Sequence, residues 1–148
     1  EISLGLVGSE MCIRDSDSLM YRYDLDYNQL VCFGFAGRDM DLNYLRWDSY
    51  DQPWKERLAE RMSRGFYNAV EYVDETGLLF RSYRKGGGSV TDGLQVYRDG
   101  VLVGDVDVPL GFRMAGYVAP YYYSYVVPDE EGERLYMFRF KWPSAPEE

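Results

Sequence analysis

Histidine is absent from this sequence of 148 residues. Enzymes commonly activate a serine or cysteine nucleophile with an imidazole, and imidazole is also a frequent ligand of zinc. The sequence therefore excludes, within these residues, a Ser-His-Asp or Cys-His nucleophile, a His-ligated zinc and an imidazole general base. This absence is the strongest functional statement that the composition allows.

An excess of basic residues and a long apolar run are also missing. The chain has 16 Lys and Arg residues against 25 Asp and Glu residues, which gives a formal net charge of −9. Binding of nucleic acid through its phosphates needs a clustered basic surface, so we expect no nucleic-acid partner. No apolar stretch approaches the roughly 20 residues of a membrane-spanning helix, so the sequence predicts no transmembrane segment.

The first sixteen residues, EISLGLVGSEMCIRDS, show neither helical nor strand periodicity. Their longest apolar run, LGLV, is too short for the core of a signal peptide. Instead the stretch LVGSEMCIRDS resembles the conceptual translation of a transposon-type sequencing adapter. We therefore expect residues 1–16 to be a non-native segment. On this interpretation the natural chain starts near Asp17, and a part of unknown length precedes it in the complete protein.

Only Cys32 is then a natural cysteine. A single cysteine supports neither an intramolecular disulfide nor a thiolate metal site. Because Cys32 lies between Val31 and Phe33 in an apolar run, we expect it to be buried in the core.

Short apolar and aromatic runs of strand length, separated by turn residues, fill most of the remaining chain. The pair Asp99-Gly100 between two such runs is the strongest hairpin signal. The two central residues of a tight hairpin turn have positive φ angles, and Asp-Gly adopts this conformation readily. The pattern predicts an all-β fold of antiparallel hairpins. The predicted strand pairs are residues 19–25 with 28–35 (joined by Asp26-Tyr27), 66–73 with 78–84, 93–98 with 101–108, and 117–127 with 133–142.

One segment departs from the strand pattern. Residues 53–64 begin with a proline, contain good helix formers and are followed by Gly65, which predicts a short helix in a long connection between strands. Trp54, Leu58 and Met62 are four residues apart and form one apolar stripe. We expect this stripe to pack on the parent sheet, and the alternative is a helix that binds a partner.

Residues 66–108 contain four predicted strands, which is the content and the length of one blade of a β-propeller. The strands carry apolar residues on both faces, as expected when a sheet is covered on both sides. We therefore predict antiparallel four-stranded blades of a truncated propeller. The predicted division is a half blade at 17–35, a loop with the helix at 36–65, a full blade at 66–108 and a partial closing blade at 109–142.

The runs RGFYNAVEYVDETGLLFRSYR, LQVYRDGVLVGDVDVP, YYYSYVV and GERLYMFRFKW resemble the C-terminal part of TolB-like six-bladed β-propeller proteins. The resemblance extends over residues 19–142 and consists of strand and turn patterns, without a catalytic signature. It implies a protein of the bacterial cell envelope, periplasmic or anchored to the outer membrane, in a family whose functions are largely unknown. The resemblance also implies that the other blades lie upstream.

Acidic pairs and a glycine-rich loop are the first groups to consider for chemistry. The pairs are Asp24/Asp26, Asp39/Asp41 and Asp105/Asp107. Two carboxylates on one face of a strand can bind a hard cation such as calcium. For Asp105 and Asp107 we favour a solvent-facing strand edge with Val106 and Val108 inside.

The glycine-rich run KGGGS lacks the order of a phosphate-binding loop and precedes a strand, so we interpret it as an inter-strand loop. The sequence predicts no cofactor and no metal.

Arginines and aromatic residues complete the set of candidate binding residues. Arg22, Arg81 and Arg84 lie beside tyrosines, where stacking would be structural, although arginines near a propeller channel can bind an anionic ligand. Long loops on rigid scaffolds often carry binding surfaces, and aromatic platforms suit sugars or peptides. The weak ligand-binding candidates are Tyr44, Trp47, Tyr50 and Trp54.

These observations favour a non-catalytic binding or scaffold propeller of the cell envelope that recognises a protein, peptide or glycan. The alternative is a propeller hydrolase or lyase whose catalytic residues lie in blades upstream of this sequence.

Overall fold

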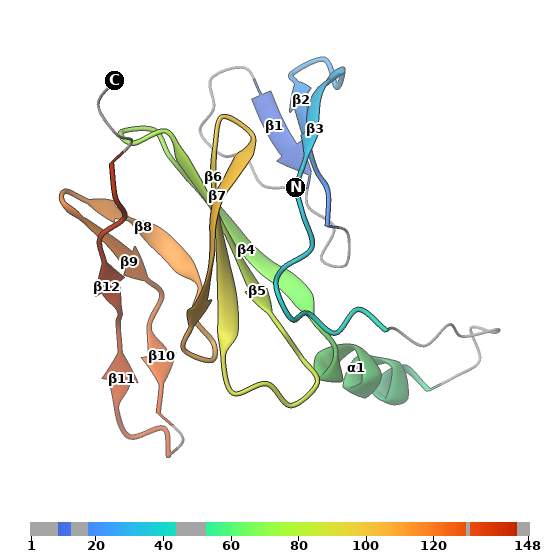
Figure 1. The fold of residues 1–148 in the computed structure, drawn as a ribbon. Coiled ribbons are helices and arrows are strands. Elements are labelled where there is room, and N and C mark those ends of the chain that lie inside the picture. The colour runs from blue at the N-terminus through green and yellow to red at the C-terminus, as the bar shows by residue number, and fades with distance from the viewer. Residues whose placement is uncertain (1–8, 13–17, 44–52, 130, 145–148) are drawn as a thin grey trace.

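A four-stranded antiparallel sheet forms the centre of the fold in the computed structural model (Figure 1). The structure describes residues 9–12, 18–43, 53–129 and 131–144. The prediction of a four-stranded antiparallel sheet within residues 66–108 is confirmed. Its strands, paired in the order β4-β5-β6-β7, are β4 (Phe66–Val73), β5 (Leu78–Arg84), β6 (Asp92–Arg98) and β7 (Val101–Val108).

Two hairpin turns lie at the same end of this sheet, because its four strands run alternately up and down. In the first, the N–H of Gly77 donates to the carbonyl of Val73 at 2.8 Å. In the second, Asp99 and Gly100 both have positive φ angles, 51° and 79°. Positive φ at both central residues is what a two-residue hairpin turn needs, so the Asp-Gly prediction is confirmed.

A second sheet contains β1 (Ser9–Cys12), β2 (Met20–Asp24) and β3 (Gln29–Phe33) in the order β1-β2-β3. The β2–β3 hairpin was predicted. Its turn is held by the Asp24 carboxylate, which accepts hydrogen bonds from the N–H groups of Asp26 at 3.0 Å and Asn28 at 2.8 Å. β1 pairs through its backbone with β2. Since backbone pairing depends little on side-chain identity, the adapter interpretation of residues 1–16 stays a prediction.

The prediction that Cys32 is buried is wrong, because its side chain is exposed. β3 is an edge strand, and its residues from Gln29 to Cys32 are all exposed. Only Phe33, at the end of the strand, packs against the core. An apolar run on an edge strand therefore does not indicate that both of its faces are covered.

A third sheet contains β8 (Met114–Val118), β9 (Tyr121–Ser124) and β12 (Arg139–Phe140) in the order β12-β9-β8, and β10 (Val127–Pro128) pairs with β11 (Leu135–Tyr136). The prediction of one strand over residues 117–127 is wrong. The chain reverses at Ala119-Pro120, where the peptide bond is cis. Proline lacks the N–H that a strand interior needs, which makes this position a natural break.

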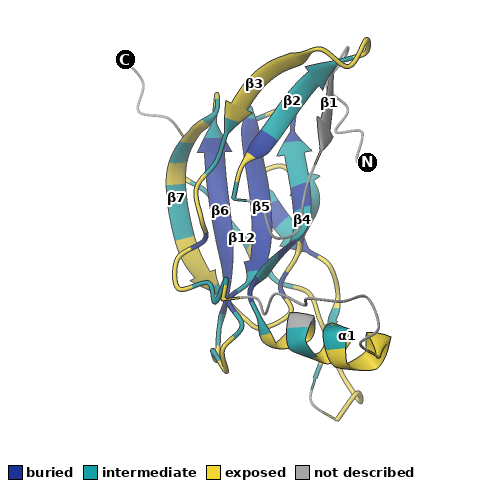
Figure 2. Cartoon of the chain, turned by 90° about the vertical axis from the view of Figure 1, so that its right-hand side faces the viewer, coloured by how far each residue is buried: buried dark blue, intermediate teal, exposed yellow. Residues whose placement is uncertain are grey.

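The second and third sheets cover opposite faces of the central sheet, which places its β5 and β6 strands among the most buried parts of the chain (Figure 2). On one face Met20 from β2 packs with Leu79 and Tyr97. On the other, Phe80 packs with Phe112 and Tyr122. The expectation of apolar residues on both faces is thus confirmed for this sheet.

The predicted helix is present as α1 (Trp54–Ser63), but its apolar stripe does not pack on the sheet. Trp54, Leu58 and Met62 are 66%, 47% and 46% exposed. The helix lies beyond the N-terminal end of β4 rather than over a face of the sheet (Figures 1 and 2). Its C-terminal end is tied down by the N–H of Gly65, which donates to the carbonyl of Asp41 at 2.7 Å.

Candidate ligand-binding site

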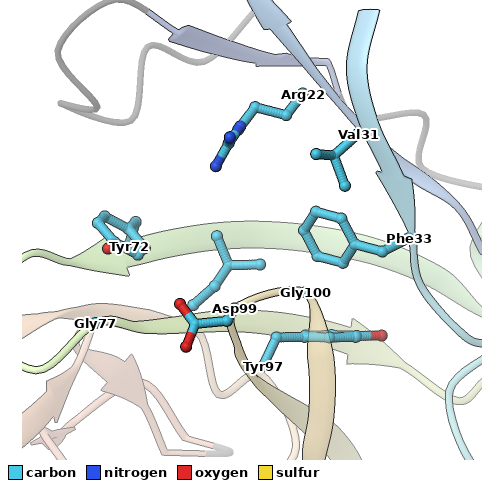
Figure 3. Close-up of a pocket in the computed structure, with 9 residues that line it drawn as sticks. Arg22, Val31, Phe33, Tyr72, Gly77, Tyr97, Asp99 and Gly100 are labelled. Carbon is cyan, nitrogen blue, oxygen red and sulfur yellow. The ribbon is translucent and has the colours of Figure 1, made fainter.

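A pocket of about 270 Å³ lies between the β2–β3 hairpin and the central sheet, at the end where the two hairpin turns lie (Figure 3). The central sheet forms its floor, the hairpin forms its roof, and the two turns contribute Gly77, Asp99 and Gly100. This position brings together segments that are far apart in the sequence.

Strand register sets the floor. Tyr72 on β4 is opposite Leu79 on β5, which is in turn opposite Tyr97 on β6. The Tyr97 ring is buried, and its hydroxyl donates to the Gln95 side chain at 3.0 Å and accepts from the N–H of Phe35 at 3.2 Å. Burial raises the pKa of Tyr97, so this hydroxyl stays neutral at physiological pH. The floor is therefore apolar and rigidly held.

The roof combines an apolar wall with a cation. Arg22 on β2 is paired with Val31 on β3, and both line the pocket with Phe33. The Phe33 ring meets the Tyr97 ring edge-on, with centroids 5.6 Å apart. This contact joins the roof of the pocket to its floor. Val31 is 38% exposed, so the outer end is open to solvent.

Arg22 and Asp99 place opposite charges in this pocket without an ion pair between them. The Arg22 Nε atom is buried and has no hydrogen-bond partner within the described residues. Figure 3 shows its guanidinium reaching down from the roof and the Asp99 carboxylate lying across the pocket at the β6–β7 turn. A buried donor without an acceptor is costly, and within the described residues no acidic side chain pairs with the Arg22 guanidinium, so an anionic group of a ligand in the pocket would be attracted to it.

A second polar cluster lies on the same face of the sheet, nearer the other end. The Asp105 carboxylate accepts hydrogen bonds from the Tyr83 hydroxyl and, at 3.1 Å, from the N–H of Arg38. The Asp107 carboxylate binds Lys85 Nζ and the Arg38 guanidinium, each at 2.6 Å. These bonds fasten the segment that follows β3 onto β5 and β7.

The protonation states in this cluster suit structural bonding rather than catalysis. Burial, followed by the hydrogen bond to Asp105, raises the pKa of Tyr83 well above its usual range, so its hydroxyl is a neutral donor. The hydrogen bonds from Lys85 and then Arg38 lower the pKa of Asp107, which remains a carboxylate. A catalytic tyrosine would need the opposite shift. The oxygens of Asp105 and Asp107 thus already accept hydrogen bonds from the protein. Of the two valines predicted to lie inside, Val108 packs against the core, whereas Val106 is 36% exposed.

One carboxylate of each of the other acidic pairs is engaged in local structure. Asp24 caps the β2–β3 turn. The Asp41 carboxylate accepts from the N–H of Asn43 and pairs with Arg64 at 2.9 Å, and these bonds lower its pKa. Within the described residues, no group of three or more His, Cys, Asp or Glu side chains is placed to hold a metal ion.

The aromatic candidates from the sequence do not meet in a described site. Tyr44, Trp47 and Tyr50 lie outside the described residues. Trp54 is at the start of α1, largely exposed, and does not line the pocket.

The three arginines have different roles. Arg22 lines the pocket. Arg81 is fully buried, with its guanidinium carbon 3.2 Å from the centroid of the Tyr67 ring and a hydrogen bond of 2.7 Å to the carbonyl of Ser18. The guanidinium of Arg84 lies 5.6 Å from the centroid of the Phe66 ring. Structural stacking is therefore confirmed for Arg81.

Sequence reasoning missed Asp99, Leu79 and Tyr72 as parts of one pocket. The Asp-Gly turn was recognised only as a hairpin signal. Strand alternation within 78–84 puts Leu79 on the same face as Arg81, but the approach of the β2–β3 hairpin to that face has no local sequence signal.

No protein-family model, curated protein or solved structure matches this chain. The helix in the described part of the chain is neither long enough nor apolar enough to cross a membrane.

Proposed function

We propose that this chain is part of a non-catalytic binding β-propeller of the bacterial cell envelope, and that its pocket beneath Arg22 receives a small ligand. The observation that carries the proposal is that the charged Arg22 side chain lines a pocket with apolar walls and has no ion-pair partner within the described residues. Ligand sites are typically concave and mostly apolar, with a few polar groups that fix orientation, and the Arg22 pocket has this composition.

The arrangement of sheets supports the propeller part of the proposal. A four-stranded antiparallel meander has an antiparallel sheet stacked on each face, as a blade has between its neighbours. The resemblance of residues 19–142 to TolB-like propellers supports the envelope part by analogy, because a shared fold does not by itself imply a shared function.

The state of the polar cluster supports binding over catalysis. Asp105 and Asp107 each accept hydrogen bonds from donors of other segments, and these partners hold the chain together. Tyr83 is kept protonated by its burial. Within the described residues, these groups therefore serve the fold rather than a reaction.

Arg22→Gln is the variant that tests the pocket, with 3-phenylpropanoate as the probe, an apolar body that carries one carboxylate. We expect millimolar probe to shift the backbone amide signals of Gly77 and Gly100 in the NMR spectrum of the full chain. Arg22→Gln should weaken this binding about tenfold, because a charge-assisted hydrogen bond to a carboxylate is lost.

Arg98→Gln is the matched control, because Arg98 ends β6 but does not line this pocket. It should bind the probe like the wild type. Amide signals that do not respond to the probe, or that respond equally in Arg22→Gln, would count against a binding site at Arg22.

A further inference from the structure

We propose that the natural ligand of this pocket is a zwitterion with an apolar body, of the class of short apolar peptides, whose carboxylate meets Arg22 and whose ammonium group meets Asp99. This inference rests on the proposed binding function and names the ligand class of the same site.

The two charges of the pocket come from opposite walls. Arg22 is on the hairpin that forms the roof, and Asp99 is in the turn beside the floor (Figure 3). Within the described residues, neither side chain has an ion-pair partner. A fixed cation and a fixed anion that face one space select a ligand with the complementary pair of charges.

Asp99 should make a simple anion such as 3-phenylpropanoate a weaker ligand than a zwitterion. An anion bound at Arg22 would share the pocket with the Asp99 carboxylate, on a chain whose formal net charge is already −9. Like charges at a binding site discriminate against the wrong ligand as strongly as matched charges favour the right one. An ammonium group on the same ligand converts this repulsion into attraction.

The space between the two charges is apolar. Leu79 and Tyr97 form the floor, and Val31 and Phe33 form the opposite wall. A sugar would leave many hydroxyl groups facing these side chains without hydrogen-bond partners, which is unfavourable. An aliphatic or aromatic side chain would instead bury apolar surface there.

The turn that carries Asp99 is shaped to present it. Asp99 has a φ of 51° and Gly100 a φ of 79°, and a β-carbon added to Gly100 would lie 3.7 Å from the Phe33 ring. The turn backbone thus packs closely beneath the roof residue Phe33 and places Asp99 in the lining of the pocket. Asparagine tolerates the same positive φ, so Asp99→Asn removes the charge without removing the turn.

The experiment compares three forms of one peptide by isothermal titration of the full chain. The probes are the dipeptide Ala-Phe, its N-acetylated form, which lacks the ammonium group, and its C-terminal amide, which lacks the carboxylate. We expect Ala-Phe to bind about fivefold or more tightly than either blocked form, since each loses one charged contact. In Asp99→Asn, Ala-Phe and acetyl-Ala-Phe should bind equally.

Asp74→Asn, an exposed aspartate in the other hairpin turn, is the matched control and should keep the wild-type preference for Ala-Phe. If acetyl-Ala-Phe binds as tightly as Ala-Phe and 3-phenylpropanoate still binds through Arg22, the zwitterion proposal is overturned while the binding site stands. If 3-phenylpropanoate and all three peptides fail to bind, the proposed function itself is overturned.

Discussion

At the scale of single residues, Asp107 shows how one carboxylate can hold two segments together. It accepts hydrogen bonds from Lys85, whose side chain is only 4% exposed, and from Arg38, which is as exposed as Asp107 itself. The Lys85 contact is the more important of the two, because a buried ammonium needs its acceptor whereas an exposed pair is screened by solvent.

Asp107→Asn should therefore destabilise the protein near neutral pH, and the loss should depend on pH. The folded-state pKa of Asp107 lies below its ordinary value of 3.8. The stabilisation is thus fully present above that value and is lost as the pH falls through the lower, folded-state pKa. Urea unfolding at a series of pH values should show the wild type and the variant converging below about pH 4. A difference that stays constant down to the acid limit would contradict this assignment.

Residue-scale prediction from the sequence succeeded where a local pattern decides the outcome and failed where a distant segment decides it. The Asp99-Gly100 turn follows from local backbone preference and was predicted. The exposure of Cys32 depends on what covers β3, and the placement of Arg22 in a pocket depends on how the β2–β3 hairpin lies on the central sheet. Neither can be read from the neighbouring residues.

At the scale of elements, the pairing of β5 with β6 depends on a glycine opposite a large ring. Tyr83 is in register with Gly93, and a β-carbon at Gly93 would overlap the Tyr83 ring. The ring lies across Gly93 so that its hydroxyl can reach Asp105 on β7. A side chain at position 93 would displace the ring and break this bond.

Gly93→Ala should lower the free energy of unfolding by about 1–3 kcal/mol, the usual cost of overpacking a buried site. Gly116→Ala is the matched control, because Gly116 is also a strand glycine but a β-carbon there meets nothing within 4 Å. It should leave stability unchanged or raise it by up to ~1 kcal/mol. Urea unfolding measures both. Equal effects of the two substitutions would show that the Tyr83 ring does not depend on Gly93.

Elements were predicted best where periodicity and turn chemistry agree. The hairpins within residues 66–108 and the helix near 53–64 have both signals and were found. The run 117–127 has strand composition throughout, but Pro120 interrupts it, and composition outweighed the turn signal in the prediction. The stripe of Trp54, Leu58 and Met62 has the right spacing for burial, yet α1 is anchored at its end and leaves the stripe exposed.

At the scale of the whole molecule, the stacking of three sheets explains why β5 and β6 are buried while the edge strand β7 is not. β5 and β6 are covered on both faces. β7 closes the sheet on one side and keeps Val101 and Val103 63% and 43% exposed. Within the described residues no strand pairs with the outer edge of β7, where Val101 and Val103 are exposed. Another chain can pair with such an edge, so β7 is the place where we expect copies of this chain to associate.

The test of this last prediction is a charge placed on the β7 edge. Val103→Lys should reduce the concentration-dependent association of the full chain in sedimentation velocity, because a lysine on an edge strand disfavours pairing with a second strand. Val90→Lys is the matched control, since Val90 is 83% exposed in the loop before β6 and is not part of a strand. The two variants carry the same added charge, so a general effect of charge on a chain of formal net charge −9 would act on both equally. Association that falls only in Val103→Lys would show that the chains associate through the β7 edge. A wild-type chain that stays monomeric at every concentration would contradict the prediction.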